Sequence, residues 1–248
     1  SPDYVKWFPS TNFSELYIAP YMFIIGWFFS GLGVIGQPHV MVRFMAIDNT
    51  KNIPKTRIYY YTWYTLFYSL TILAAFVARL LVPETNNLDP ELALPTLALN
   101  LLPEFFVGLV LAGIFAATMS TADSQILACT ASITNDLLLN KKNNYFINKL
   151  VTLIVTVFVV TIAINDNKNV FNLVLMSWST LACCFSPLLI VNSLQQKVSE
   201  FLSLMMMIIP LITLLLWRYF GLSEFIYEVA PGIVSGILTF FVFKLFRK

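Results

Sequence analysis

Small oxygen-bearing side chains gather on one face of an apolar segment near the middle of the chain. The run 116–125 reads Ala-Ala-Thr-Met-Ser-Thr-Ala-Asp-Ser-Gln. At about 100° per residue, a helix places Ala117, Ser120, Thr121 and Ser124 within an arc of about 100°. A dehydrated alkali cation needs several uncharged oxygens, and two adjacent hydroxyls with a carbonyl one turn earlier supply part of that shell. The alternative, in which each hydroxyl bonds to the carbonyl four residues earlier, remains open.

The same run carries a carboxylate, Asp123, inside an otherwise apolar segment. A charge at that depth is unfavourable by about 2.5 to 3.5 kcal/mol on insertion scales and usually marks an ion path or a paired site. No basic residue in the sequence lies at comparable depth. We therefore expect its partner to be an ion, a proton or a group outside these residues.

A second candidate site is a cluster of glycines in the first apolar segment. Gly26, Gly31, Gly33 and Gly36 lie within eleven residues and are followed by Pro38. Glycine disfavours a helix by up to about 1 kcal/mol per position, and proline removes a backbone donor. A break in mid-membrane frees backbone groups that lipid cannot satisfy, so the break must face protein, an ion or a ligand. A glycine-rich surface for close helix packing is the other interpretation.

The elements that position these residues must be membrane helices. Of the 248 residues, 58% are hydrophobic and only 11% charged, and the mean hydropathy is +0.76; a soluble domain carries about 25% charged residues. The net charge of +2 gives no reason to expect nucleic-acid binding. A single histidine, His39, and the absence of nucleophile-elbow or phosphate-loop motifs predict no enzyme, no catalytic residues and no cofactor.

Seven apolar runs approach the roughly 20 residues that a helix needs to cross a bilayer. We therefore predict an all-α integral membrane protein with about seven transmembrane helices. The two shortest runs are lengthened by flanking residues such as Lys149 and Lys244, whose charged ends reach the interface. The predicted spans are residues 16–42, 58–78, 105–122 continuing past Asp123, 150–165, 169–196, 201–217 and 229–243.

The distribution of basic residues predicts the direction of these spans in a plasma (inner) membrane. With the N-terminus outside and the C-terminus cytoplasmic, only four of the fifteen basic residues fall outside: Lys6, Arg79, Lys168 and Arg218. This is the bias of the positive-inside rule. The longest outer connection, 83–103, contains an apolar stretch between prolines that suits a short surface helix. No linker divides the chain, so we expect 1–248 to be a single transmembrane domain.

At its two candidate segments the chain resembles the sodium:solute symporter family, and in particular the proline symporter branch. The resemblance rests on residues 36–46, Gly-Gln-Pro-His-Val-Met-Val-Arg-Phe-Met-Ala, and on 116–121 with 131–137, Ala-Ser-Ile-Thr-Asn-Asp-Leu. Weaker similarity continues over 178–187 and 216–246. The resemblance implies a five-plus-five inverted-repeat fold with 16–196 as the second repeat and 197–248 as two additional C-terminal helices. On this mapping the N-terminal repeat is missing, and we expect the chain alone not to transport.

The resemblance also implies a role for particular residues in sodium-coupled import of a small organic solute by alternating access. Ala117 would offer its carbonyl, and Ser120 and Thr121 their hydroxyls, to the main sodium site. Asp123 and Ser124 match positions near a second sodium site in some members. Sodium is the only metal expected. The candidates for the substrate pocket are Ser30, Gly31, Gly33, Val34, Ile35 and Pro38.

The chain departs from the proline symporters at several of these positions. Ser30, Val34 and Ile35 stand where proline transporters carry aromatic residues, whereas Pro38 is retained. The predicted solute is therefore proline, another amino acid or a small carboxylate. Ser186 replaces the glycine that precedes the matched Pro187.

Two alternatives from other classes remain open. A seven-helix receptor or photoreceptor fits the number of spans, but a retinal protein needs a lysine midway along its last span, and Lys244 lies at the edge. A membrane subunit that does not itself transport fits the missing half.

Overall fold

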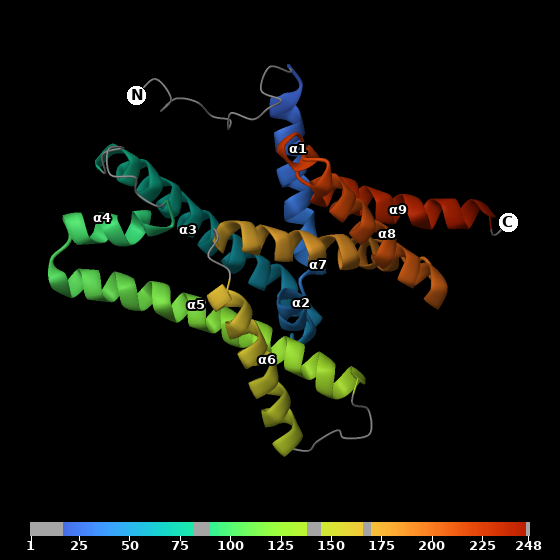
Figure 1. Ribbon diagram of the computed structural model, residues 1–248, viewed down its shortest axis with the longest axis horizontal. Coiled ribbons are helices and arrows are strands. Elements are labelled where there is room, and N and C mark those ends of the chain that lie inside the picture. Colours follow the sequence, from blue (N-terminus) through green and yellow to red (C-terminus); the bar gives the residue numbers. More distant parts are fainter. Residues whose placement is uncertain (1–16, 82–89, 138–144, 166–169, 247–248) are drawn as a thin grey trace. The chain divides into compact units, whose positions relative to one another are not determined.

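The computed structural model describes residues 17–81, 90–137, 145–165 and 170–246, and every regular element within these ranges is a helix (Figure 1). Seven of the helices are long and apolar enough to cross a membrane. The predicted all-α membrane architecture is therefore confirmed. The main helices are α1 (Ala19–Leu32), α2 (Pro38–Met45), α3 (Ile53–Leu81), α4 (Ala93–Leu101), α5 (Glu104–Ser132), α6 (Tyr145–Asn165), α7 (Val170–Ser193), α8 (Glu200–Tyr219) and α9 (Val229–Phe246).

The first predicted span is interrupted. A 3₁₀ segment, Gly33–Gly36, follows α1, and Gln37 is extended with φ −90° and ψ 111° before α2 begins at Pro38. Proline suits the first position of a helix, because a backbone N–H at that position would have no hydrogen-bond partner within the helix. The helix break expected from the glycines and Pro38 is thus confirmed.

The chain divides into two units, which are described separately. The first consists of Ser1–Met45 with Ile162–Lys248, and the second of Ala46–Thr161. The first unit therefore contains the broken helix together with α7, α8 and α9, whereas the second contains α3, α4, α5 and most of α6.

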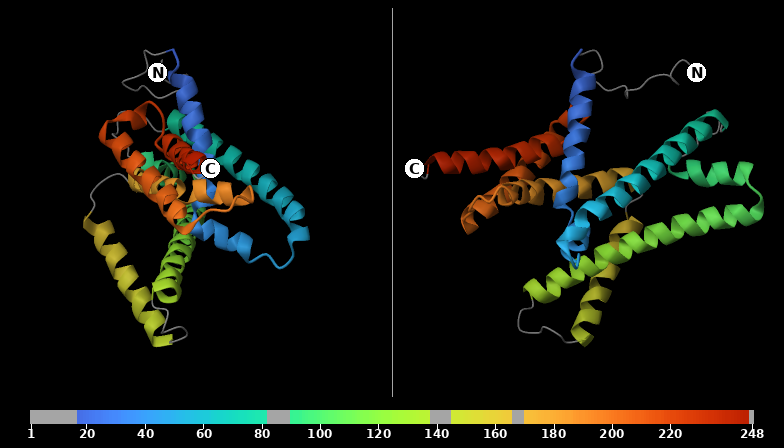
Figure 2. Two further views of the ribbon diagram at one scale, coloured as in Figure 1. Left: turned by 90° about the vertical axis from the view of Figure 1, so that its right-hand side faces the viewer. Right: turned by 180° about the vertical axis from the view of Figure 1, so that it is seen from behind.

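Close helix contacts hold the first unit together, with α9 packed against both α7 and α8 (Figure 2). Gly232 and Gly236, one turn apart on α9, allow this approach. A Cβ on Gly232 would collide with the Cys183 sulfur, and one on Gly236 would lie 2.5 Å from the Pro187 ring and 2.9 Å from the Pro210 ring. Small residues at this spacing permit such approach in membranes. One cluster of the core consists of Ala182, Tyr227, Val229 and Ile233.

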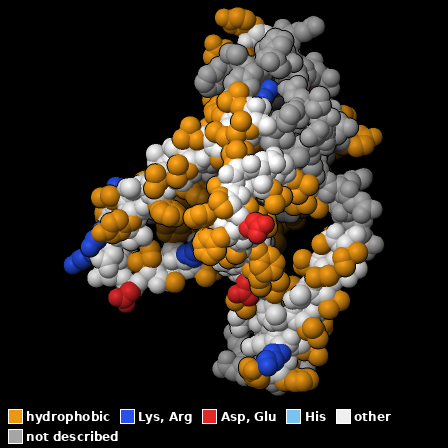
Figure 3. All heavy atoms as spheres, turned by 90° about the vertical axis from the view of Figure 1, so that its left-hand side faces the viewer, with side chains coloured by type: hydrophobic (Ala, Val, Ile, Leu, Met, Phe, Trp, Pro, Cys, Tyr) orange, Lys and Arg blue, Asp and Glu red, His pale blue; other side chains and the backbone are white. Residues whose placement is uncertain are grey.

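The second unit has little interior of its own. α4 packs against α3 and α5, and α4 occupies the stretch where a short outer helix was expected. In each of α3, α5 and α6, only 6% of the residues in the apolar stretch are buried, compared with 33% in α7 and 39% in α9. Hydrophobic side chains accordingly cover much of the face shown in Figure 3, with few charged groups among them. These faces suit lipid or another polypeptide.

Candidate functional site

Three side chains donate hydrogen bonds to backbone carbonyls around the helix break. The Gln37 amide donates to the Trp178 carbonyl at 3.1 Å, and the Trp178 indole N–H donates to the Ser30 carbonyl at 3.3 Å. The Ser186 hydroxyl donates to the Gly33 carbonyl at 3.5 Å. Gln37 is 1% exposed, so an unpaired amide there would be costly. The break is therefore supported by α7.

The glycines of the break also bring its backbone against α7. A Cβ on Gly36 would lie 2.6 Å from the Ser186 hydroxyl oxygen and 2.9 Å from the Leu181 carbonyl oxygen. A Cβ on Gly33 would lie 2.7 Å from that of Ala182. The glycine cluster therefore serves both purposes: it interrupts the helix and it allows close packing against α7. Gly31 differs, because a Cβ at this position would meet nothing within 4 Å.

The six candidates for the substrate pocket fall into two groups around the broken helix. Ser30 and Gly33 are buried, whereas Gly31 and Pro38 are exposed and Val34 and Ile35 are half-buried. The close contact of Gly33 is with Ala182 of α7, and the open space is at Gly31. Of the six candidates, Gly31 and Pro38 are therefore the exposed ones, and Ser30 and Gly33 are enclosed by the protein.

The candidate sodium ligands lie together on α5, in the second unit. The Thr121 hydroxyl donates to the Ala117 carbonyl at 3.0 Å, and the Ser124 hydroxyl donates to the Ser120 carbonyl at 2.8 Å. The back-bonding interpretation therefore describes both hydroxyls. A hydroxyl that donates its proton keeps two acceptor lone pairs, so this bond is compatible with cation binding. Ala117, Ser120, Thr121 and Asp123 are exposed, and Ser124 is half-buried.

The structure adds a buried polar cluster that the sequence did not suggest. The Glu228 side chain is 3% exposed and accepts a hydrogen bond from the Ser179 hydroxyl at 3.1 Å. An Arg218 guanidinium nitrogen lies 3.5 Å from the same carboxylate. The sequence assigned both charges to an outer connection, and the only signal of burial is their position next to the ends of two apolar spans.

The neighbouring Tyr227 joins this cluster to α1 and α7. Its hydroxyl donates to the Leu175 carbonyl at 3.1 Å, and its ring stacks on Trp27 at 5.3 Å between centroids. Burial raises the pKa of Tyr227 to about 12, so the phenol remains neutral at physiological pH. These contacts of Tyr227 fix the connection between α8 and α9 to α1 and α7.

Comparison with known proteins identifies the family of the chain. The sequence model of the sodium:solute symporter family matches residues 5–210. The chain belongs to the sodium:solute symporter family. The family is one of transporters, which disfavours a receptor, a photoreceptor or an enzyme. No solved structure matches the chain significantly.

Several curated relatives are transporters of proline. The chain is 30% identical over 234 residues to the high-affinity proline transporter PutP of Bacillus subtilis, covering 91% of this chain and 50% of the relative. It is 29% identical over 238 residues to the sodium/proline symporter of Escherichia coli, covering 91% and 47%. The osmoregulated proline transporter OpuE of Bacillus subtilis is 27% identical, covering 91% and 48%. The chain thus spans about half the length of the curated relatives it matches.

Proposed function

We propose that this chain forms one half of a sodium-coupled symporter that imports a small organic solute, with proline as the first candidate. The observation that carries the proposal is the helix broken at Gly33–Pro38 in a member of this family. Discontinuous membrane helices expose backbone groups where transporters bind solutes and ions. The names of the relatives support proline.

In this proposal α5 contributes to the main sodium site. The Ala117 carbonyl and the Ser120 and Thr121 hydroxyls supply uncharged oxygens, and the remaining ligands come from the half of the symporter that the aligned region of the relatives does not include. Asp123 and Ser124 are the candidates for a second sodium site. Asp123 is exposed on α5 and Ser124 is half-buried, so the carboxylate in particular is accessible to that other half.

The pocket for the solute lies along the broken helix. Gly31, beside which the space is open, and the exposed Pro38 lie next to the solute, and Val34 and Ile35 present half-buried aliphatic side chains to it. Sodium binding that is stronger in the outward-open state shifts the population toward that state, which couples the ion gradient to uptake by alternating access.

The proposal is tested by uptake of labelled proline into proteoliposomes. We expect a symporter assembled from this chain and the other half to accumulate proline with an inward sodium gradient but not with a potassium gradient. Other amino acids and small carboxylates, added as competitors, identify the solute if proline is not accumulated. Uptake without sodium contradicts the coupling, and uptake by vesicles that contain these 248 residues alone contradicts the division into halves.

A further inference from the structure

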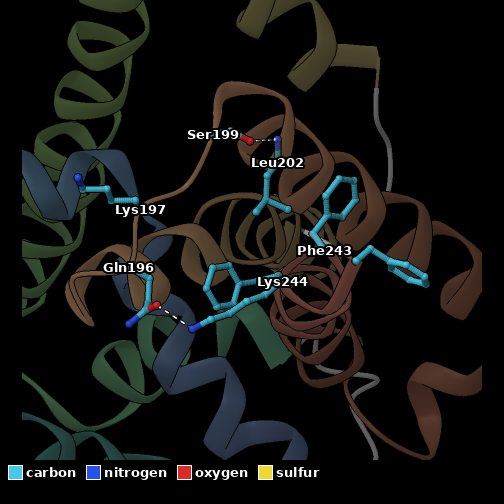
Figure 4. A pocket seen from close by; sticks show the side chains of 8 residues that line it. Gln196, Lys197, Ser199, Leu202, Phe243 and Lys244 are labelled. Carbon is cyan, nitrogen blue, oxygen red and sulfur yellow. Dashed lines mark hydrogen bonds between the residues drawn. The ribbon is translucent and has the colours of Figure 1, made fainter. Parts of the chain in front are cut away.

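A cavity of about 620 Å³ lies in the first unit where α7 ends, α8 begins and α9 ends (Figure 4). This volume is within the range of about 300 to 1,000 Å³ typical of small-molecule sites. Because three membrane-crossing helices end here, the cavity opens at a boundary between membrane and water, where the phosphates of phospholipids lie. It is lined by Gln196, Lys197, Ser199, Leu202, Phe240, Phe243, Lys244 and Phe246.

The lining combines positive charge with an apolar floor. Its charged residues are Lys197 and Lys244, and no acidic residue is among the lining residues described. Leu202 and Phe240 are buried and Phe243 is half-buried. The lining therefore matches a ligand that has a negative group at one end and hydrocarbon at the other.

The polar side of the cavity is preformed. The Lys244 ammonium donates to the Gln196 side-chain oxygen at 3.1 Å, as Figure 4 shows, and lies 5.7 Å from the centre of the Phe240 ring. Gln195, with a left-handed φ of 55°, turns the chain at the end of α7, and the Gln196 N–H bonds to the Val191 carbonyl at 3.4 Å. An ammonium carries three donors, so Lys244 keeps two for a ligand.

We propose that this cavity binds the headgroup of an anionic phospholipid. Lys197 and Lys244 supply the positive charge, and Leu202, Phe240 and Phe243 contact the start of the acyl chains. Basic pockets between membrane helices bind such headgroups, and each lysine near an anionic surface contributes about 1 kcal/mol. The predicted direction of the helices assigns the site to the cytoplasmic leaflet. The site is independent of the transported solute.

The test is a lipid titration of the full chain purified in an uncharged detergent. Phosphatidylglycerol and phosphatidylcholine with identical acyl chains are added separately, and the lipid-bound species are counted by native mass spectrometry. We expect the wild type to bind phosphatidylglycerol more tightly. The double variant K197Q/K244Q should lose about 25-fold in affinity, which corresponds to about fivefold for each lysine.

Two controls separate this site from general charge effects. K51Q/K55Q removes two exposed lysines from the second unit and should keep the preference, and so should K197R/K244R, which retains both charges. Equal binding of the two lipids by the wild type overturns the proposal. So does an unchanged preference in K197Q/K244Q, or displacement of phosphatidylglycerol by excess inorganic phosphate, which would indicate a site for free anions.

Discussion

The two units solve the problem of polar groups in a membrane in different ways. In the first, the helix break finds its partners within the unit, through Gln37, Trp178 and Ser186. In the second, the hydroxyls of Thr121, which is exposed, and Ser124, which is half-buried, donate to carbonyls of their own helix. The polar groups of the break are therefore bonded across helices of the first unit, whereas the two hydroxyls of α5 are bonded within one helix.

The contrast also applies to charge. The buried carboxylate of Glu228 has a guanidinium and a hydroxyl as partners inside the first unit. Asp123 is exposed on α5, and no ion pair involves it within the described residues. The carboxylate of Glu228 thus has partners within its own unit, whereas an intramembrane carboxylate such as Asp123 is unfavourable unless a partner compensates its charge.

The largest effect should come from filling the contact between the break and α7. Gly36→Val places side-chain atoms against Ser186 and the backbone of Leu181, so we expect the free energy of unfolding to fall by about 3 kcal/mol. Circular dichroism during unfolding in mixed micelles measures it. Gly31→Ala, where the space is open, should change stability by less than about 1 kcal/mol. Equal losses in the two variants would show that α7 does not hold the break.

The next largest effect should follow from removal of the buried carboxylate. Glu228→Gln leaves the Arg218 charge without its partner, which costs about 3 to 5 kcal/mol for a fully buried pair. Because the Arg218 side chain is 35% exposed, we expect a loss of about 2 kcal/mol. The same unfolding assay applies to Glu104→Gln, an exposed carboxylate that should change stability by less than about 1 kcal/mol. Adding Arg218→Gln to Glu228→Gln should recover part of the loss, and no recovery would rule out the ion pair as its cause.

Tyr227→Phe should have a smaller effect that depends on pH. At neutral pH the lost hydrogen bond to Leu175 lowers stability by about 1 kcal/mol. The folded chain holds the phenol proton up to about pH 12, whereas an unfolded tyrosine releases it near pH 10. The wild type therefore keeps its full stability below pH 10 and loses stability as the pH rises to 12, by about 2.7 kcal/mol for two pKa units. The difference between wild type and variant should shrink and then change sign across that window. A constant difference from pH 9 to 12 would contradict a buried phenol.

The smallest effect on stability should occur on α5. Ser120→Ala and Thr121→Ala remove exposed hydroxyls, so each should change the unfolding free energy by less than about 0.5 kcal/mol. A loss as large as that of Glu228→Gln would mean that these hydroxyls serve the fold of the second unit.

The sequence predicted the membrane spans and offered the helix break as one of two interpretations of the glycine cluster. Length and apolar composition predicted all seven membrane helices, because a bilayer requires about 20 apolar residues wherever a helix crosses it. The interruption followed from Gly33, Gly36 and Pro38, since their weak helix preference is a local property. The exact boundaries were not predicted: α1 ends at Leu32 and α2 begins at Pro38, both within the span predicted as the single range 16–42.

Long-range partners could not be predicted in the same way. The bonds of Gln37 and Ser30 to Trp178 join residues more than 140 positions apart, and no spacing in the sequence encodes them. In the sequence, Arg218 and Glu228 look like ordinary charged residues of an outer connection. Their burial could not be predicted, because it depends on how that connection folds onto α7. The sodium ligands of α5 remain a prediction.

In the proposed symporter α5 contributes sodium ligands while the first unit provides the scaffold. The most direct test is the sodium dependence of uptake by the complete symporter with Ser120→Ala, Thr121→Ala or the control Thr118→Ala, whose hydroxyl bonds to the Phe115 carbonyl. We predict that the sodium concentration for half-maximal uptake rises by about tenfold or more in the first two variants, which corresponds to about 1.4 kcal/mol of lost cation binding. The control should behave as the wild type. An unchanged sodium dependence in Ser120→Ala and Thr121→Ala would contradict this role of α5.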